Sequence, residues 1–220
     1  KPITTKVGEL NQLIRIAKRK KLLLTEATFF NYHNQFRFVK KFIGKPSNIE
    51  QVFVNFTIPM PKKNSLLLSP KFHGGSFMDM STYTASINRI LIEENLKKKS
   101  IIVKKNIQKL IISYDVLLKY KTKVFIGTFR FGKKYNNKIL IFLRNRSIEI
   151  NRAFSPPSDQ KLKIQITKKN QAQKVFVKKD NCFENYLSEV IKNIKNKQYT
   201  FYFDQMIKDE NFRFKLLKVN

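Results

Sequence analysis

Between residues 22 and 129, short apolar runs of strand length alternate with helical patterns. Residues 22–30 and 49–58 are rich in β-forming side chains, which predicts two strands. Between them, residues 34–43 place Phe, Val and Ile on one side and stop before a Gly and a Pro, which predicts a helix. This alternation constrains the fold strongly, because a strand and the helix that follows it pack as adjacent layers.

The same order returns further along the chain. Residues 66–68 begin another strand, and residues 80–92 alternate Thr, Ser and Asn with other side chains, which predicts an extended segment. Residues 106–119 have apolar side chains at helical spacing, and residues 123–129 again have a strand pattern. Two β-α-β halves of this kind predict an α+β fold, a ferredoxin-like β-α-β sandwich.

A proline-bearing connection, residues 58–75, separates the two halves. Proline lacks a backbone donor and holds the chain extended, so several prolines stiffen a connection. We therefore predict a projecting hairpin that contacts a partner, and the alternative is a plain surface loop. The predicted partner-binding residues of the hairpin are Pro59, Met60, Pro61, Ser69 and Pro70.

Two further parts flank this ferredoxin-like region of residues 22–129. Residues 1–21 are expected to be a basic N-terminal helical extension, because residues 5–20 have helical spacing. Residues 130–220 are expected to be a C-terminal α+β extension or a second small domain, mostly β with one helix. The boundary is placed near residues 130–137. The predicted strands of the extension are residues 138–143, 147–154, 161–167, 174–179, 199–203 and 212–217, and its predicted helix is residues 183–195.

The charge of the chain points to a partner. Of 220 residues, 42% are apolar, which is enough for a buried core. The 45 Lys and Arg residues outnumber the 15 Asp and Glu residues and give a formal charge of +30. Because such a chain repels itself, we expect a polyanionic partner, with nucleic acid favoured over an anionic membrane surface. The predicted RNA-binding residues are Lys18, Arg19, Lys20, Lys21, Lys62, Lys63, Lys71, His73, Arg89, Arg130, Lys133, Lys134, Arg144 and Arg146.

Groups suited to catalysis are scarce in the sequence. His33 and His73 do not have the spacing of metal ligands, and Asp79 has no second acid nearby in the sequence. Cys182 is the single cysteine, and one Gly-Gly pair is a very weak signal for a phosphate loop. No apolar run reaches the roughly 18–20 residues of a membrane span. These features predict no enzyme, no catalytic residues, no metal, no cofactor, no small-molecule substrate and no membrane span.

The order of these segments resembles a known family, the tenth protein of the small ribosomal subunit (the uS-ten family). The segments that carry the resemblance are FNYHNQF (30–36), IPMPKK (58–63), LLLSPKFH (66–73), SINRILI (86–92) and KTKVFI (121–126). The sequence departs from the family pattern at Lys62, where the family usually has Thr, and at His73, which is displaced by two residues. Arg89 matches the final Arg of the family's Arg-bearing strand, without the preceding Arg and His.

The resemblance implies a structural protein in the head of the small ribosomal subunit. The hairpin would reach between neighbouring head proteins and rRNA, so the implied partners are rRNA and other small-subunit ribosomal proteins. The extensions and the Lys, Asn and Phe bias are similar to a divergent mitochondrial ribosome, which implies translation in the mitochondrial matrix. The alternative function is an organellar RNA-binding maturation or processing factor outside the ribosome. No targeting signal is read from the sequence, which begins with Lys and leaves room for a presequence.

Overall fold

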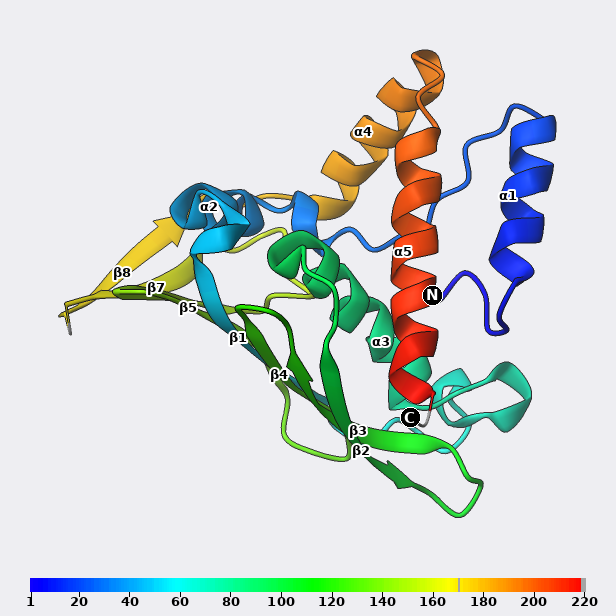
Figure 1. Ribbon diagram of the computed structural model, residues 1–220, viewed down its shortest axis with the longest axis horizontal. Helices are drawn as coiled ribbons and strands as arrows, with labels where there is room; N and C mark the ends of the chain where they lie inside the picture. Colours follow the sequence, from blue (N-terminus) through cyan, green and yellow to red (C-terminus); the bar gives the residue numbers. More distant parts are fainter. Residues whose placement is uncertain (170, 219–220) are drawn as a thin grey trace.

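The computed structural model describes residues 1–169 and 171–218 (Figure 1). Its centre is one eight-stranded sheet, in which the strands are ordered β2-β3-β4-β1-β5-β6-β7-β8. The strands are β1 (Ile49–Ile58), β2 (Lys98–Lys105), β3 (Ile111–Lys119), β4 (Val124–Phe131), β5 (Asn136–Leu143), β6 (Arg146–Asn151), β7 (Leu162–Lys168) and β8 (Gln171–Val177). The helices are α1 (Glu9–Arg19), α2 (Asn34–Ile43), α3 (Ser76–Ile87), α4 (Cys182–Lys195) and α5 (Thr200–Leu217).

The sheet is antiparallel except at its middle. β1 pairs with β4 in parallel, with Val54 opposite Gly127, and with β5 in the antiparallel sense. The parallel pair arises because the chain leaves β1, crosses the sheet through α3 and returns through the β2–β3 hairpin before β4. A parallel partner needs such a long crossover, whereas β5–β6 and β7–β8 are joined by short turns and β6–β7 by the longer connection of residues 152–161.

Helices cover one face of the sheet (Figure 1). α3 packs against β3 and β4, and α5 packs on the far side of α3. The main core lies between the sheet and these helices, and its fully buried side chains include Val52, Phe125 and Ile139. A smaller core joins α1 to α5 through Leu10, Ile14 and Phe203. α3 therefore lies in the interior, between the sheet and a second helix.

The ferredoxin-like prediction is wrong, because two central elements have the opposite type. Residues 76–87 form α3, and residues 88–92 continue it as one turn of π-helix, where we expected a strand over 80–92. α3 is buried on most sides, so it lacks the polar face that makes a helix recognisable in a sequence. Its buried Ser and Thr side chains alternate with larger ones and imitate the period of a strand.

The second exchanged element is β3, which lies within the helix expected over 106–119. Tyr114, Val116 and Leu118 are buried in alternation, as a strand requires. Leu117 points to the other face and is half exposed, at 49%. Because apolar residues lie on both faces of β3, the alternation of apolar and polar residues typical of a strand is lost. The remaining apolar positions have a spacing that resembles that of a helix.

The proline-bearing connection is not a projecting hairpin. Its two ordered turns, Leu66–Leu68 and Pro70–Phe72, are short 3-10 helices, and no strand lies between Ile58 and Ser76. The sequence pattern failed here because Ser69 and Pro70 begin a helical turn instead of ending a strand. The apolar triplet of the first turn is partly exposed.

Other predicted elements have mixed outcomes. The helix over 34–43 and the strand over 49–58 are confirmed, as are the helix at the N-terminal side and the four strands between 138 and 179. Residues 22–29 belong to neither a helix nor a strand. Residues 199–203 and 212–217 lie mainly in α5, so the C-terminal part has two helices, one more than expected. The buried side of α5 includes the charged residues Asp209, Glu210 and Arg213, so its apolar residues show no clear helical spacing and its two aromatic ends resemble strands.

The boundary expected near residues 130–137 falls between β4 and β5. Both strands pair with β1, so the sheet runs through this position. The division of the chain into three parts stays a prediction. In the part of the chain that the structure describes, no helix is both long and apolar enough to cross a lipid bilayer.

Candidate active site

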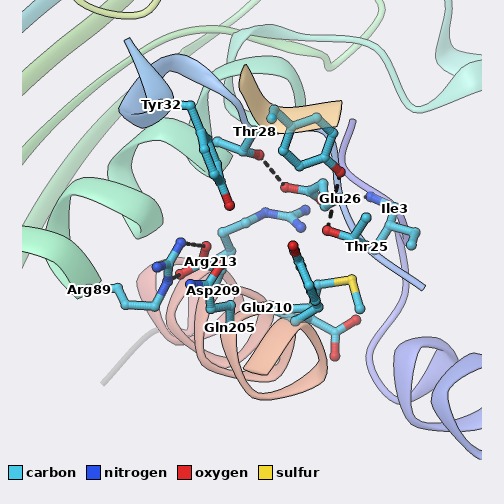
Figure 2. A pocket seen from close by; sticks show the side chains of 13 residues that line it. Ile3, Thr25, Glu26, Thr28, Tyr32, Arg89, Gln205, Asp209, Glu210 and Arg213 are labelled. Carbon is cyan, nitrogen blue, oxygen red and sulfur yellow. Dashed lines mark hydrogen bonds and ion pairs between the residues drawn. The ribbon is translucent and has the colours of Figure 1, made fainter. Parts of the chain in front are cut away.

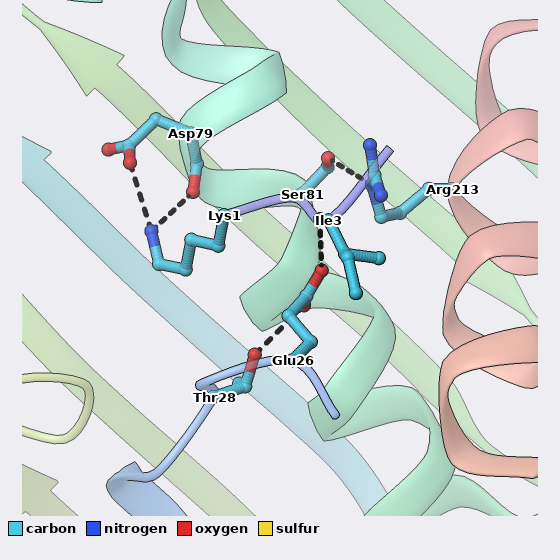
Figure 3. A network of polar contacts seen from close by, with 7 residues as sticks. All are labelled: Lys1, Ile3, Glu26, Thr28, Asp79, Ser81 and Arg213. Atoms are coloured by element: carbon cyan, nitrogen blue, oxygen red, sulfur yellow. Dashed lines mark hydrogen bonds and ion pairs between the residues drawn. The ribbon is translucent and has the colours of Figure 1, made fainter. Parts of the chain in front are cut away.

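The first residue of the chain lies against α3 and meets two of its polar side chains. The Nζ atom of Lys1 donates to Asp79 Oδ1 at 2.9 Å and to the backbone oxygen of Asp79 at 2.8 Å (Figure 3). The same Nζ atom is 4.4 Å from the ring centroid of Tyr83. Asp79 and Tyr83 are four residues apart on a helix and so share one face. An ammonium group, a carboxylate and a phenol therefore meet at one place.

Burial and charge fix the protonation of this cluster. Burial lowers the pKa of Lys1, but Tyr83 and Asp79 raise it more, so that its pKa lies above the ordinary value. Burial raises the pKa of Tyr83, and Lys1 offsets this rise only in part. At neutral pH, Lys1 is thus a charged donor and Tyr83 a neutral phenol. This combination can give a proton to an oxygen and stabilise negative charge on it.

Aromatic side chains hold the ring of Tyr83 in place. Its centroid lies 4.6 Å from that of Phe154, 5.4 Å from that of Phe56 and 5.9 Å from that of Phe30. These three rings also contact one another, at 5.2 Å between Phe30 and Phe154 and between Phe56 and Phe154. They come from β1, from the segment after β6 and from the turn before α2. The phenol is therefore fixed by the core of the protein.

Hydrogen bonds also anchor the segment that follows Lys1. The backbone N–H of Ile3 donates to Glu26 Oε2 at 2.8 Å, and Glu26 accepts from Thr28 through its other oxygen (Figure 3). Two residues after Asp79, Ser81 accepts from Arg213 Nε of α5 at 3.0 Å. These contacts hold the Lys1 segment and α3 against the same part of the molecule.

A tightly packed polar cluster lies behind these contacts, with the side chains of Arg89, Asp209 and Arg213 facing one another (Figure 2). Arg89 donates to both carboxylate oxygens of Asp209, at 2.8 and 3.0 Å, and Arg213 is almost fully buried beside them. Burial raises the pKa of Asp209, although Arg89 acts in the opposite sense. The cavity between these groups measures about 30 Å³. That is room for a water molecule but not for a larger ligand, so this cluster packs behind the Lys1 residues and does not itself receive a ligand.

Space for a substrate lies on the open side of Lys1. A hollow of about 380 Å³ opens there to solvent. It is lined by Lys1, Ile3, Thr25, Glu26, Ala27 and Phe29. A ligand in this hollow would lie beside the Lys1 ammonium. In residues 1–169 and 171–218, no three His, Cys, Asp or Glu side chains gather as metal ligands do.

The residues predicted to bind RNA do not gather at one place. Arg89 is paired with Asp209 beside the small cavity, and Arg130 is paired with Asp115 on the sheet. Arg146 lies over the ring of Phe42 at 4.7 Å. The exposed members, spread over α1 and several turns, are Lys18, Arg19, Lys20, Lys21, Lys62, Lys63, Lys71, His73, Lys133, Lys134 and Arg144. The hairpin residues Pro59, Met60, Pro61, Ser69 and Pro70 lie in the turns between β1 and α3.

Sequence reasoning missed all three groups of the Lys1 cluster. Asp79 was set aside because no second acid is near it in the sequence, and Tyr83 lay in a segment expected to be a strand. The usable signal was the spacing of four between Asp79 and Tyr83, which places them on one face of a helix. The contact of Lys1, 78 positions away from Asp79, has no local signal.

Comparison with known proteins gives the fold a context. No protein-family model matches the chain. Among curated proteins, dTDP-3,4-didehydro-2,6-dideoxy-alpha-D-glucose 3-reductase from Streptomyces antibioticus is 21% identical over 196 residues, which cover 87% of this chain and 60% of that protein. The enzyme of that name from Saccharopolyspora spinosa is 25% identical, covering 77% of this chain and 52% of that protein. The chain thus spans about half to three fifths of the length of these relatives.

Solved structures match most of the chain. The 3-ketoreductase KijD10 from Actinomadura kijaniata, in complex with NADP and TDP-benzene, superimposes with a TM-score of 0.90 at 18% identity, covering 98% of this chain and 68% of that one. The UDP-N-acetylglucosamine 3-dehydrogenase GnnA from Acidithiobacillus ferrooxidans gives a TM-score of 0.78 at 11% identity, with 98% and 67% coverage. The chain therefore has the fold of a large part of these oxidoreductases.

These findings correct the functional predictions. The resemblance to the ribosomal family is wrong, and with it the role in translation and the rRNA and ribosomal-protein partners, because the matching proteins are reductases and dehydrogenases. The RNA-processing alternative is equally unsupported. The predictions of a non-enzyme without a small-molecule substrate and of a mitochondrial location are overturned as well, since the matching relatives are bacterial sugar-modifying enzymes. The prediction of a non-enzyme depended on the scarcity of His and paired acids, and the names of the matching proteins contradict it.

Proposed function

We propose that the chain carries the sugar-binding and proton-transferring part of an oxidoreductase that acts on a ring carbonyl of a nucleotide-linked sugar. The observation that carries the proposal is the Lys1–Asp79–Tyr83 cluster beside an open hollow. Its support is the fold, which is shared with reductases of such sugars. A fold alone does not define a function, so the weight rests on the geometry of the cluster.

The cluster suits the proton half of a carbonyl reduction. Tyr83 stays protonated because burial raises its pKa, so its hydroxyl can donate to the oxygen of a ketone as that oxygen gains negative charge. The Lys1 ammonium would stabilise the same charge, and Asp79 holds Lys1 in position through its carboxylate. In this scheme, Tyr83 is the proton donor, Lys1 the electrostatic partner and Asp79 a positioning residue.

The described residues do not form a cradle for a dinucleotide cofactor. Such a cradle is built by a parallel strand, a glycine-rich turn and the N-terminus of a helix. The parallel strand β1 is followed by a proline-bearing turn, and β4 leads to β5 without a helix. We therefore assign no hydride step to residues of this chain, and the proposal covers the proton and the sugar.

The known variants of KijD10 support the choice of residues. Structures exist of forms of that protein in which a lysine is replaced by Ala or Glu and of a form in which a tyrosine is replaced by Phe. The lysine precedes the tyrosine by nearly the same stretch of chain as Lys1 precedes Tyr83. Because of this similar spacing, Lys1 and Tyr83 are the first residues to substitute in a test of the proposal.

The proposal predicts that Tyr83→Phe and Lys1→Met each lower turnover of a dTDP-linked 3-keto sugar by about 10²–10⁴-fold, as expected for loss of a proton donor or its partner. The measurement is oxidation of NADPH by the protein assayed together with the part that binds the cofactor, because the described residues form no cradle for it. Tyr199→Phe and Lys6→Met, which change the same residue types outside the cluster, should keep the parent rate. Full activity of Tyr83→Phe would contradict the role of the phenol. If the unaltered protein neither turns over such a sugar nor binds TDP, the proposed function fails.

A further inference from the structure

A short segment after β6 forms a rigid platform beside Tyr83. The segment, residues 152–155, is held by Asn137 of the neighbouring strand β5, whose side chain is 3% exposed. Asn137 Oδ1 accepts from the backbone N–H of Phe154 at 3.0 Å, and its Nδ2 donates to Ser155 Oγ at 2.9 Å and to Tyr135 Oη at 3.1 Å. The Tyr135 and Ser155 hydroxyls are themselves hydrogen-bonded at 2.9 Å. One buried amide thus fixes the segment of residues 152–155 and the ring of Tyr135.

Arg152 stands at the exposed surface of this platform. Its guanidinium carbon lies 5.0 Å from the ring centroid of Tyr135, and its Nε donates to the backbone oxygen of Ser155 at 3.2 Å. None of the ion pairs found within residues 1–169 and 171–218 includes Arg152. One face of the guanidinium lies along an aromatic ring, and donors remain for a ligand.

The backbone at Arg152 adds a second observation. Its φ is +56°, in the left-handed region that Gly and Asn occupy more readily than other residues. An arginine at such a position costs stability, and residues held in this way tend to cluster at functional sites. Nothing in the packing requires the guanidinium group, because its contacts are one ring and one backbone oxygen. Lys21, Lys109 and Lys197 share a positive φ, so this backbone supports the assignment only together with the stacking of the guanidinium on Tyr135.

The platform connects directly to the proposed proton donor. Phe154, two residues after Arg152, packs on the ring of Tyr83 at 4.6 Å between centroids. The platform therefore lies on the Phe154 side of Tyr83, next to the place proposed for the sugar. In a nucleotide-linked sugar, the group next to the sugar ring is a diphosphate, and a guanidinium group binds phosphate oxygens with paired hydrogen bonds.

We propose that Arg152 and Tyr135 form the subsite for the diphosphate of a nucleotide-linked sugar, with Arg152 as the contact to phosphate. This inference rests on the proposed function and names the part of the substrate that the platform holds. Tyr135, 39% exposed, fixes the guanidinium plane by stacking and adds its ring as a surface for the rest of the ligand. Lys133 and Lys134, both exposed, lie just before Tyr135 and make the surroundings cationic.

The test is calorimetric titration of the purified protein with TDP and, separately, with thymidine, which lacks the phosphates. The informative variant is Arg152→Asn, because Asn accepts the left-handed backbone while removing the charge. We expect TDP to bind about tenfold more weakly or worse, since one charge-assisted contact is lost. Thymidine binding should stay as in the parent. Thermal stability should stay the same or rise. Arg152→Lys, which keeps a charge but not the paired donors, should fall between.

The matched control is Arg146→Ala. Arg146 also lies over an aromatic ring, that of Phe42 at 4.7 Å, but outside the platform, so TDP binding should not change. Unchanged TDP binding in Arg152→Asn would overturn the inference, while the proposed function would stand if Tyr83→Phe still loses turnover. An equal loss of TDP binding in Arg146→Ala and Arg152→Asn would also overturn it, since it would indicate general charge attraction. Absence of TDP binding in the parent protein would remove both proposals.

Discussion

Tyr114 is a fully buried tyrosine between the sheet and α3. Its ring stacks on that of Phe129 with centroids 4.7 Å apart, and its hydroxyl is 3.0 Å from Thr84 Oγ1. Burial raises the pKa of Tyr114 well above its ordinary value, and the hydrogen bond to Thr84 offsets this only in part. The folded protein therefore holds this proton more tightly than the unfolded chain does.

This proton makes stability depend on pH in the alkaline range. An unfolded tyrosine loses its proton near pH 10, whereas folded Tyr114 keeps it, so the stabilisation is complete below pH 10 and is lost as pH rises further. One such group contributes a slope of about 1.4 kcal/mol per pH unit above that point. We expect Tyr114→Phe to be less stable at pH 7 but to lose stability less steeply between about pH 10 and 11.

The measurement is the free energy of urea unfolding at a series of pH values for the parent and the variant. Phe129→Leu is the control, because it disturbs the packing on the Tyr114 ring without removing a titratable group and should leave the alkaline slope unchanged. Parallel curves for the parent and Tyr114→Phe above pH 10 would show that Tyr114 does not carry the effect.

The residues of the site differ in how far the sequence could predict them. Asp79 and Tyr83 become neighbours once residues 76–87 are known to be a helix, so this half of the cluster depended on one element. Lys1 reaches α3 across 78 positions, and no local pattern encodes such a contact. Arg152 shows its left-handed backbone only in three dimensions. Single residues of this site therefore needed the fold before their chemistry could be recognised.

Among the elements, α3 has the most demanding position. It begins after Gly75, whose φ is +111°, and Ser76 Oγ donates to the backbone oxygen of Ile111 in β3 at 3.0 Å. A Cβ atom added to Gly75 would lie 2.7 Å from that same oxygen. The helix that carries Asp79 and Tyr83 can thus start here only because residue 75 has no side chain.

We expect Gly75→Ala to destabilise the protein by roughly 3 kcal/mol or more, because a strained backbone and a clash with backbone oxygen add together. Gly8 has a φ of +88° and no atom within 4 Å of an added Cβ, so replacing it measures the cost of the strained backbone without a clash. Gly8→Ala should therefore cost only about 1–2 kcal/mol. Urea unfolding of both variants checks this, and equal losses would mean that the contact with Ile111 is not limiting.

The elements also show where the period of a sequence is informative. α2 and β1 each have one buried and one wet side, and both were predicted with their bounds. α3 and β3 have apolar or small residues on both sides because each lies between two layers or bears an apolar outer face. For such elements, packing overrides the local pattern. Both elements lie in the central part of the chain. The predicted fold class is therefore wrong, although most of the individual helices and strands were predicted correctly.

At the scale of the whole molecule, the formal charge of +30 has no single site. Basic side chains lie on α1, in several turns and on the sheet, and some are paired with acids. The RNA partner expected from this charge is not supported, because net charge describes solubility and attraction to anions in general and does not identify a ligand. The reductase-like fold and the Lys1 cluster were not visible at this scale.

The excess charge predicts a dependence on salt. Repulsion among exposed Lys and Arg side chains is screened as ionic strength rises, so the folded state should gain stability between 20 and 300 mM NaCl. An increase in Tm of about 2–4 °C would correspond to roughly 1 kcal/mol for a chain of this size. Thermal unfolding followed by circular dichroism measures this directly.

A charge variant serves as the control for the salt effect. Lys62→Glu combined with Lys63→Glu lowers the net charge at two exposed positions away from the Lys1 cluster. This variant should begin with a higher Tm at low salt and gain less when salt is added. If the Tm of the parent falls with NaCl, attraction within ion pairs outweighs repulsion, and the expectation is wrong.

The parallel pairing of β1 with β4 has a consequence for synthesis of the chain. β1 is complete at Ile58, but neither of its partners exists until β4 ends at Phe131 and β5 follows. At about 5–20 residues per second, the roughly 70 residues in between take about 4–15 s to be made. During that interval, the apolar side chains of β1 have no strand to pair with. A nascent chain of this protein therefore has a period in which shielding by a chaperone would matter most.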